Sequence, residues 1–187
     1  MNAAHRRYVV LEQGVGAVIV NFLLNGAIAW AAFRGMSSIP MWGAQSIAGD
    51  TIATAFVLPF LTCLIVTPLA RREVARGRLP SFEHARGAYP LLSALPATTF
   101  RRALVLGTAA TAVAAPIAIV AFSAVRLGGI TAADFIWVKA GFAAVLAGVV
   151  APLVALAALA DTFGAGVELT SATGPGATTV GAKEKIT

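Results

Sequence analysis

The sequence is poor in charged residues, and this shortage decides its broad class. Charged residues make up 12% of the chain, whereas hydrophobic residues make up 58%. Soluble domains carry about 25% charged residues, so a water-exposed surface of ordinary polarity cannot be built from this composition. The apolar residues also gather in long runs, as membrane spans do. We therefore predict an all-α integral membrane protein.

Cysteine and histidine are almost absent, which excludes several kinds of chemistry. Cys63 is the one cysteine, so the chain forms neither an internal disulfide nor a CxxC redox pair. His5 and His84 fall outside the apolar runs, which argues against a haem or a histidine metal site within a bilayer. We expect no metal and no cofactor. The sequence also offers no nucleophile–base pair and no carboxylate dyad, so we do not expect an enzyme.

Four long apolar segments predict a four-helix transmembrane bundle with short outer loops. Each segment exceeds the ~20 residues that a helix needs to cross the hydrocarbon core. The predicted spans are residues 8–33, 45–70, 102–125 and 134–160. They form a predicted transmembrane domain over residues 1–162. Residues 163–187 are rich in Gly, Ala and Thr and have little to bury, so we expect a disordered cytoplasmic tail there.

Local signals mark the ends and bends of these helices. Thr131 and Asp134 form a T-x-x-D capping pattern at the start of the fourth span. Four prolines fall inside predicted spans, where membrane helices tolerate them if neighbours supply hydrogen-bond donors. They are Pro59, Pro68, Pro116 and Pro152. We interpret them as packing kinks, with a moving hinge as the alternative.

Lysine is scarce and arginine is unevenly distributed, which predicts an orientation. The loop 71–101 and its flank are arginine-rich, and cytoplasmic loops carry the excess of positive charge. Both termini and this loop are therefore expected in the cytoplasm, across what the arginine and alanine bias suggests is a bacterial inner (plasma) membrane. No nucleic-acid-binding pattern accompanies the arginines. We predict contact with anionic phospholipid head groups through Arg71, Arg72, Arg76, Arg78, Arg101 and Arg102.

A sparse internal repeat is also visible. Arg6-Arg7 precedes the first span as Arg101-Arg102 precedes the third, and Pro59 and Pro152 stand in equivalent places in the second and fourth. Two helical hairpins that enter the membrane from the same side would be parallel repeats. Composition alone also accounts for so few matches, so two hairpin repeats stay an alternative.

Polar side chains inside the first two spans mark a candidate site. Asn21 and Asn25 lie near the middle of the first span, on a face of mostly small residues. Ser46, Asp50 and Thr54 are spaced by four in the second span and share one face. Because these spans run in opposite directions, Thr54 is expected at about the depth of Asn25. An Asn25–Thr54 hydrogen bond is then geometrically possible.

Asp50 needs a partner, because an unpaired carboxylate inside a membrane costs a few kcal/mol at the centre of the bilayer. Lys139, early in the fourth span, is the one cation at similar depth on the outer side. We predict an Asp50–Lys139 ion pair, or else a water-filled vestibule that solvates both. The asparagines allow two interpretations, as hydrogen bonds between helices or as part of a ligand site.

Two functions follow from this pattern. In the first, a polar path carries a small solute or ion through a permease- or pore-like protein, lined by Asn21, Asn25, Ser46, Asp50, Thr54 and Lys139. Four helices rarely enclose a pathway, so this function implies a homo-oligomer, most simply a two-fold dimer. In the second, the chain is a non-catalytic accessory or assembly subunit, and the same residues contact a membrane partner.

Overall fold

The computed structural model describes residues 3–79, 94–124 and 131–172, and the long elements in these ranges are all helices. The first span combines α1 (Ala3–Arg7), a π-helical segment η1 (Tyr8–Val15) and α2 (Gly16–Phe33). The others are α3 (Ile47–Ala75), α6 (Thr99–Ala124) and α7 (Ala132–Ala172). Four of these helical stretches are long and apolar enough to cross a membrane. The prediction of four spans is thus confirmed at the level of length and composition.

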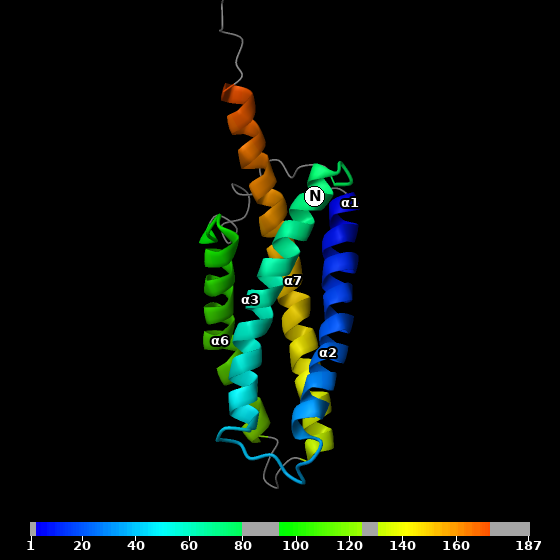
Figure 1. Cartoon of the computed structure of the whole chain (residues 1–187), viewed down its shortest axis with the longest axis vertical. Helices are drawn as coiled ribbons and strands as arrows, with labels where there is room; N and C mark the ends of the chain where they lie inside the picture. The colour runs from blue at the N-terminus through cyan, green and yellow to red at the C-terminus, as the bar shows by residue number, and fades with distance from the viewer. Residues whose placement is uncertain (1–2, 80–93, 125–130, 173–187) are drawn as a thin grey trace, which may run out of the picture.

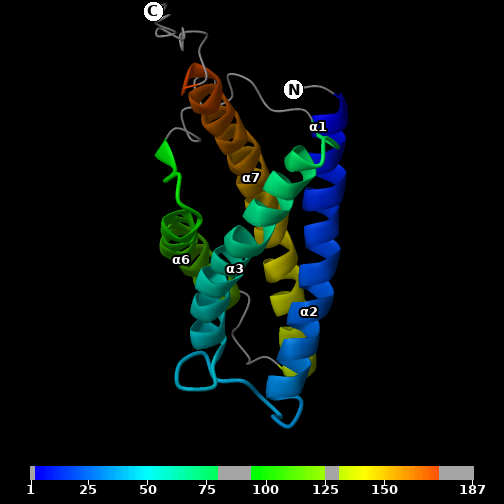
Figure 2. The ribbon, with the colours of Figure 1, turned by 45° about the horizontal axis from the view of Figure 1, so that its top comes forward.

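The four spans do not form a square bundle, because α7 occupies the centre. It packs against η1 and α2 on one side and against α3 on the other, while α6 packs against α3 (Figure 1). α2 and α3 do not pack extensively against each other. The view in Figure 2 likewise places α7 behind the gap between α2 and α3. α7 therefore packs against both α2 and α3, which have little contact with each other.

Small residues explain why α7 is the central helix. Its buried side facing the other helices carries alanines at helical spacing: Ala140, Ala143, Ala147, Ala151, Ala155 and Ala158. Small side chains let helix backbones approach closely, which is how helices associate in a membrane. On its other side, Val145 and Val149 are about two-thirds exposed. This side would face lipid.

The helix ends lie at two opposite ends of the molecule. α1 and the C-terminal end of α7 lie at the same end of the molecule as the end of α3, and the α2–α3 connection lies at the opposite end (Figures 1 and 2). At that opposite end, Ser46 caps α3 by accepting a hydrogen bond from the backbone N–H of Gly49. Thr131 accepts one from the N–H of Asp134. The T-x-x-D cap is confirmed.

The last helix is longer than expected. α7 continues to Ala172, so the prediction that disorder starts at residue 163 is wrong for residues 163–172. Once a helix is nucleated, each further residue adds a hydrogen bond at little cost, and this segment contains no proline to stop it. Residues 173–187 lie outside the described residues, as do residues 80–93 of the arginine-rich loop.

Candidate functional site: a polar groove between α2 and α3

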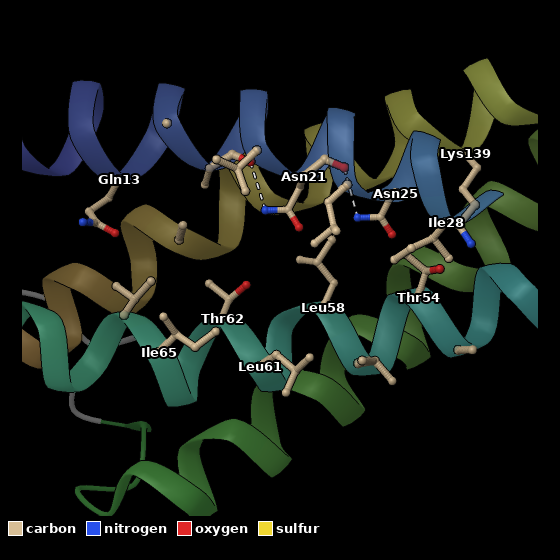
Figure 3. A pocket seen from close by; sticks show the side chains of 18 of the residues that line it. Gln13, Asn21, Asn25, Ile28, Thr54, Leu58, Leu61, Thr62, Ile65 and Lys139 are labelled. Atoms are coloured by element: carbon tan, nitrogen blue, oxygen red, sulfur yellow. Dashed lines mark hydrogen bonds between the residues drawn. The ribbon is translucent and has the colours of Figure 1, made fainter. Parts of the chain in front are cut away.

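A groove of about 520 Å³ lies between the first span and α3, with α7 as its floor (Figure 3). We call it the polar groove. Its lining from the first span includes Glu12, Gln13, Ala17, Asn21, Asn25 and Ile28, and its lining from α3 includes Asp50, Thr54, Val57, Leu61, Thr62 and Ile65. Lys139 and Ala151 of α7 complete it. The residues of the two predicted polar stripes thus meet across one groove, with Ser46 as the exception.

The two asparagines bond to their own helix. Nδ2 of Asn21 donates to the carbonyl of Ala17 at 2.9 Å, and Nδ2 of Asn25 donates to the carbonyl of Asn21 at 3.0 Å. These bonds direct the amide oxygens away from α2 and into the groove, as Figure 3 shows. Asn25 is only 8% exposed, so its amide lies deep in the groove. The groove therefore presents hydrogen-bond acceptors at mid-span.

Asp50 and Lys139 form an ion pair at one end of the groove. Nζ of Lys139 lies 2.5 Å from Oδ1 of Asp50, and the side chain of Lys139 is 4% exposed. The predicted pair is confirmed. A lysine on a helix floor can reach across to α3 because its four-carbon stem packs along apolar surface. Oδ2 of Asp50 is buried and accepts no hydrogen bond within the described residues, so the carboxylate keeps an unused acceptor.

Thr54 and Ser46 differ from the sequence-based expectation. Thr54 lines the groove but makes no hydrogen bond with Asn25, whose Nδ2 donates to the carbonyl of Asn21 instead. Ser46 does not line the groove, and its part in a polar path or interface stays a prediction. Its hydroxyl donates to the carbonyl of Gly43 and accepts from the N–H of Gly49. The hydroxyl of Ser46 thus serves the helix cap both as a donor and as an acceptor, one turn before Asp50.

A second polar cluster, at the opposite end, was not predicted. Arg102 of α6 is fully buried and donates through Nη2 to both oxygens of Asp161 of α7, at 3.0 and 2.8 Å. Its Nε donates to the carbonyl of Pro96, and Arg71 of α3 also reaches Asp161 at 3.0 Å. This cluster ties α3, α6 and α7 together where few backbone contacts join α6 to α7.

This cluster changes the predicted lipid contacts. Arg102 cannot touch a head group while it is buried against Asp161, so that assignment is wrong. Desolvating a guanidinium is costly, and a bidentate carboxylate is the partner that compensates for it. Arg71 is partly exposed, and Arg72, Arg76, Arg78 and Arg101 are exposed. Their contact with lipid stays a prediction.

Sequence reasoning missed residues whose role depends on depth rather than on a motif. Glu12, Gln13 and Thr62, none of which belongs to the predicted polar stripes, line the groove. Asp161 could have been found. It ends the fourth span at the level where Arg102 begins the third, since these spans are antiparallel neighbours along the chain.

The described residues contain no group of three or more His, Cys, Asp or Glu side chains that could hold a metal ion. No protein-family model matches the chain, and neither a curated protein nor a solved structure matches it. Any assignment of function therefore rests on the groove itself.

Proposed function

We propose that the polar groove is one half of an intramembrane path for a small solute or ion, and that a second copy of the chain closes it. The supporting observation is the position of acceptor oxygens of Asn21 and Asn25 at mid-span, in a groove that opens sideways between α2 and α3. Acyl chains cannot hydrogen-bond to these oxygens. Water, a solute or another protein surface must then meet them.

A two-fold dimer is the simplest way to enclose the groove. One chain supplies two walls and a floor, and a second chain placed on the open side supplies the remaining wall. The rims support such a contact, since Leu24 of α2 and Leu61 of α3 are about half exposed beside the groove. Positive charge at the end that holds α1 and the end of α3 supports placing this end, and both termini, in the cytoplasm of a bacterial inner membrane.

Cysteine accessibility tests whether the groove is wet. In a Cys63→Ser background, Ala53→Cys places a thiol in the groove, and Ile52→Cys places one beside it on an exposed surface outside the groove lining. Asn25→Cys and Leu23→Cys form a second matched pair on α2. We expect a membrane-impermeant thiol reagent to label positions 53 and 25 in intact membranes and to spare positions 52 and 23. Absence of labelling at both groove positions would contradict an aqueous path.

Oxidative cross-linking tests the dimer. Leu61→Cys, on the rim, should form a disulfide between two copies in the membrane, whereas Val113→Cys on α6 should not, because α6 contributes nothing to the groove lining. The accessory-subunit function makes the opposite prediction. A groove filled by a helix of a different protein would stay unlabelled at positions 53 and 25, and Leu61→Cys would form no homodimer.

A further inference from the structure

Three nitrogen atoms in the groove already donate hydrogen bonds. The amide nitrogens of Asn21 and Asn25 each donate one bond to a backbone carbonyl of α2, and the ammonium of Lys139 donates one to Asp50. At these four residues, three oxygens accept no hydrogen bond within the described residues: the two amide oxygens and Oδ2 of Asp50, which is buried. The threonine hydroxyls can serve either way. A ligand that brings hydrogen-bond donors therefore finds acceptors in this groove.

The formal charge of the groove lining also favours a positively charged ligand. Its lining holds two carboxylates, Glu12 and Asp50, and one ammonium, Lys139, so the formal balance is one negative charge. Glu12 is exposed near one end, and Asp50 lies near the other. Because the walls have a low dielectric constant, this net negative charge attracts a cation into the groove and repels an anion.

The walls argue against a bare metal ion. Between the polar groups the lining is aliphatic, with Val20, Leu24, Ile28, Val57, Leu61 and Ile65 on the two sides. Alkali and alkaline-earth ions need a shell of several oxygens, which these walls do not supply. An apolar body with a charged nitrogen fits both parts of the lining, because pockets for small molecules combine apolar walls with a few placed polar groups.

We propose that the groove binds an organic ammonium ion. Its nitrogen donates to Oδ2 of Asp50 and to the amide oxygen of Asn25, and its hydrocarbon part lies along the aliphatic walls of α2 and α3. In this arrangement Lys139 holds the Asp50 carboxylate through Oδ1 and leaves the second oxygen to the ligand. This inference rests on the proposed function, since a dry groove would admit no charged solute.

Protection of a reporter thiol tests the inference. Full-length Cys63→Ser/Ala53→Cys protein in proteoliposomes is treated with the impermeant thiol reagent in the presence of n-butylammonium, n-butyrate or sodium ions. We expect n-butylammonium at roughly 10 mM to slow labelling about tenfold, as a Kd on the order of 1 mM requires. Butyrate, which has the same chain length and the opposite charge, should leave the rate unchanged, as should sodium.

Two variants locate the effect. Asp50→Asn/Lys139→Gln removes both charges of the pair without leaving either one unpaired, and it should abolish protection by n-butylammonium. Glu12→Gln changes an exposed side chain that makes no ion pair in the described residues. It removes one negative charge from the groove lining without removing a contact to the ligand, so it should weaken protection by only about two- to threefold.

The outcomes separate the inference from the function it rests on. If position 53 labels but n-butyrate protects as well as n-butylammonium, the path stands and the ligand class is wrong. Protection that survives in Asp50→Asn/Lys139→Gln would also overturn the assignment. If position 53 does not label at all, both the aqueous path and the ammonium site are wrong.

Discussion

Arg102 of α6 donates two hydrogen bonds to the carboxylate of Asp161 of α7, across 59 residues of sequence, and it does so with no exposed surface. The two spans have few other direct contacts. This pair, joined by Arg71, therefore fixes how α6 sits relative to α7 and α3. It lies at the arginine-rich end of the bundle, far along α3 from the Asp50–Lys139 pair.

Replacing Arg102 should cost far more stability than replacing the arginine before it. Arg102→Met removes a guanidinium that is fully buried against Asp161 and should lower the free energy of unfolding by about 3–5 kcal/mol, as breaking a buried pair does. Arg101→Met, which alters an exposed side chain, should change it by no more than about 0.5 kcal/mol. Unfolding in mixed micelles by added denaturing detergent measures both. Equal losses would show that the pair does not hold α6 in place.

The Asp50–Lys139 pair should appear as a coupling energy. Asp50→Asn leaves Lys139 buried without a counter-charge, and Lys139→Gln does the same to Asp50, so each single variant should be destabilised. The double variant should be milder than the sum of the singles by about 0.5–3 kcal/mol. The same unfolding assay, run on all four proteins of the cycle, gives this value. Strictly additive losses would mean that the two charges act independently.

Gly107 should resist even the addition of one methyl group. A Cβ at this position would lie 3.1 Å from the ring carbons and the backbone oxygen of Phe56, where α6 meets α3. Gly107→Ala should therefore lose about 1 kcal/mol by overpacking. Gly141→Ala, on α7 with no atom within 4 Å of the new Cβ, should be neutral or stabilising by up to about 1 kcal/mol, as helical Gly→Ala changes are. Thermal unfolding in detergent measures whether each substitution lowers or raises the stability.

Cys63 should be unreactive in the folded protein. Its side chain is fully buried, with the sulfur 3.7 Å from the hydroxyl of Thr67 and from the carbonyl of Thr99. Reaction with a membrane-permeant maleimide must then await local opening, which should slow it by at least about a hundredfold relative to the unfolded chain. Cys63→Ser/Arg101→Cys, with its thiol at an exposed position, provides the reactive control. Rapid labelling of Cys63 in the native protein would contradict this packing.

The sequence alone determined that the chain is helical, with runs long and apolar enough to span a membrane. A helix that must satisfy its own backbone in lipid needs a long apolar run, and such runs are visible residue by residue. It also determined that Asn21 and Asn25 share a face with Ala17 and Ile28, since helical spacing fixes which residues point the same way. The Asp50–Lys139 pair was also predicted, because the two residues were expected at similar depth and an unpaired charge inside a membrane is costly.

Which helices are neighbours was decided only by the tertiary structure. Antiparallel spans can pack in several orders, and the buried alanines of α7 favour the one that puts it in the centre and separates α2 from α3. That order turns two polar stripes into one groove, commits Ser46 to a cap and buries Arg102 against Asp161. Spacing along a chain specifies faces and depths, whereas the partner of each face depends on close packing among all four helices at once.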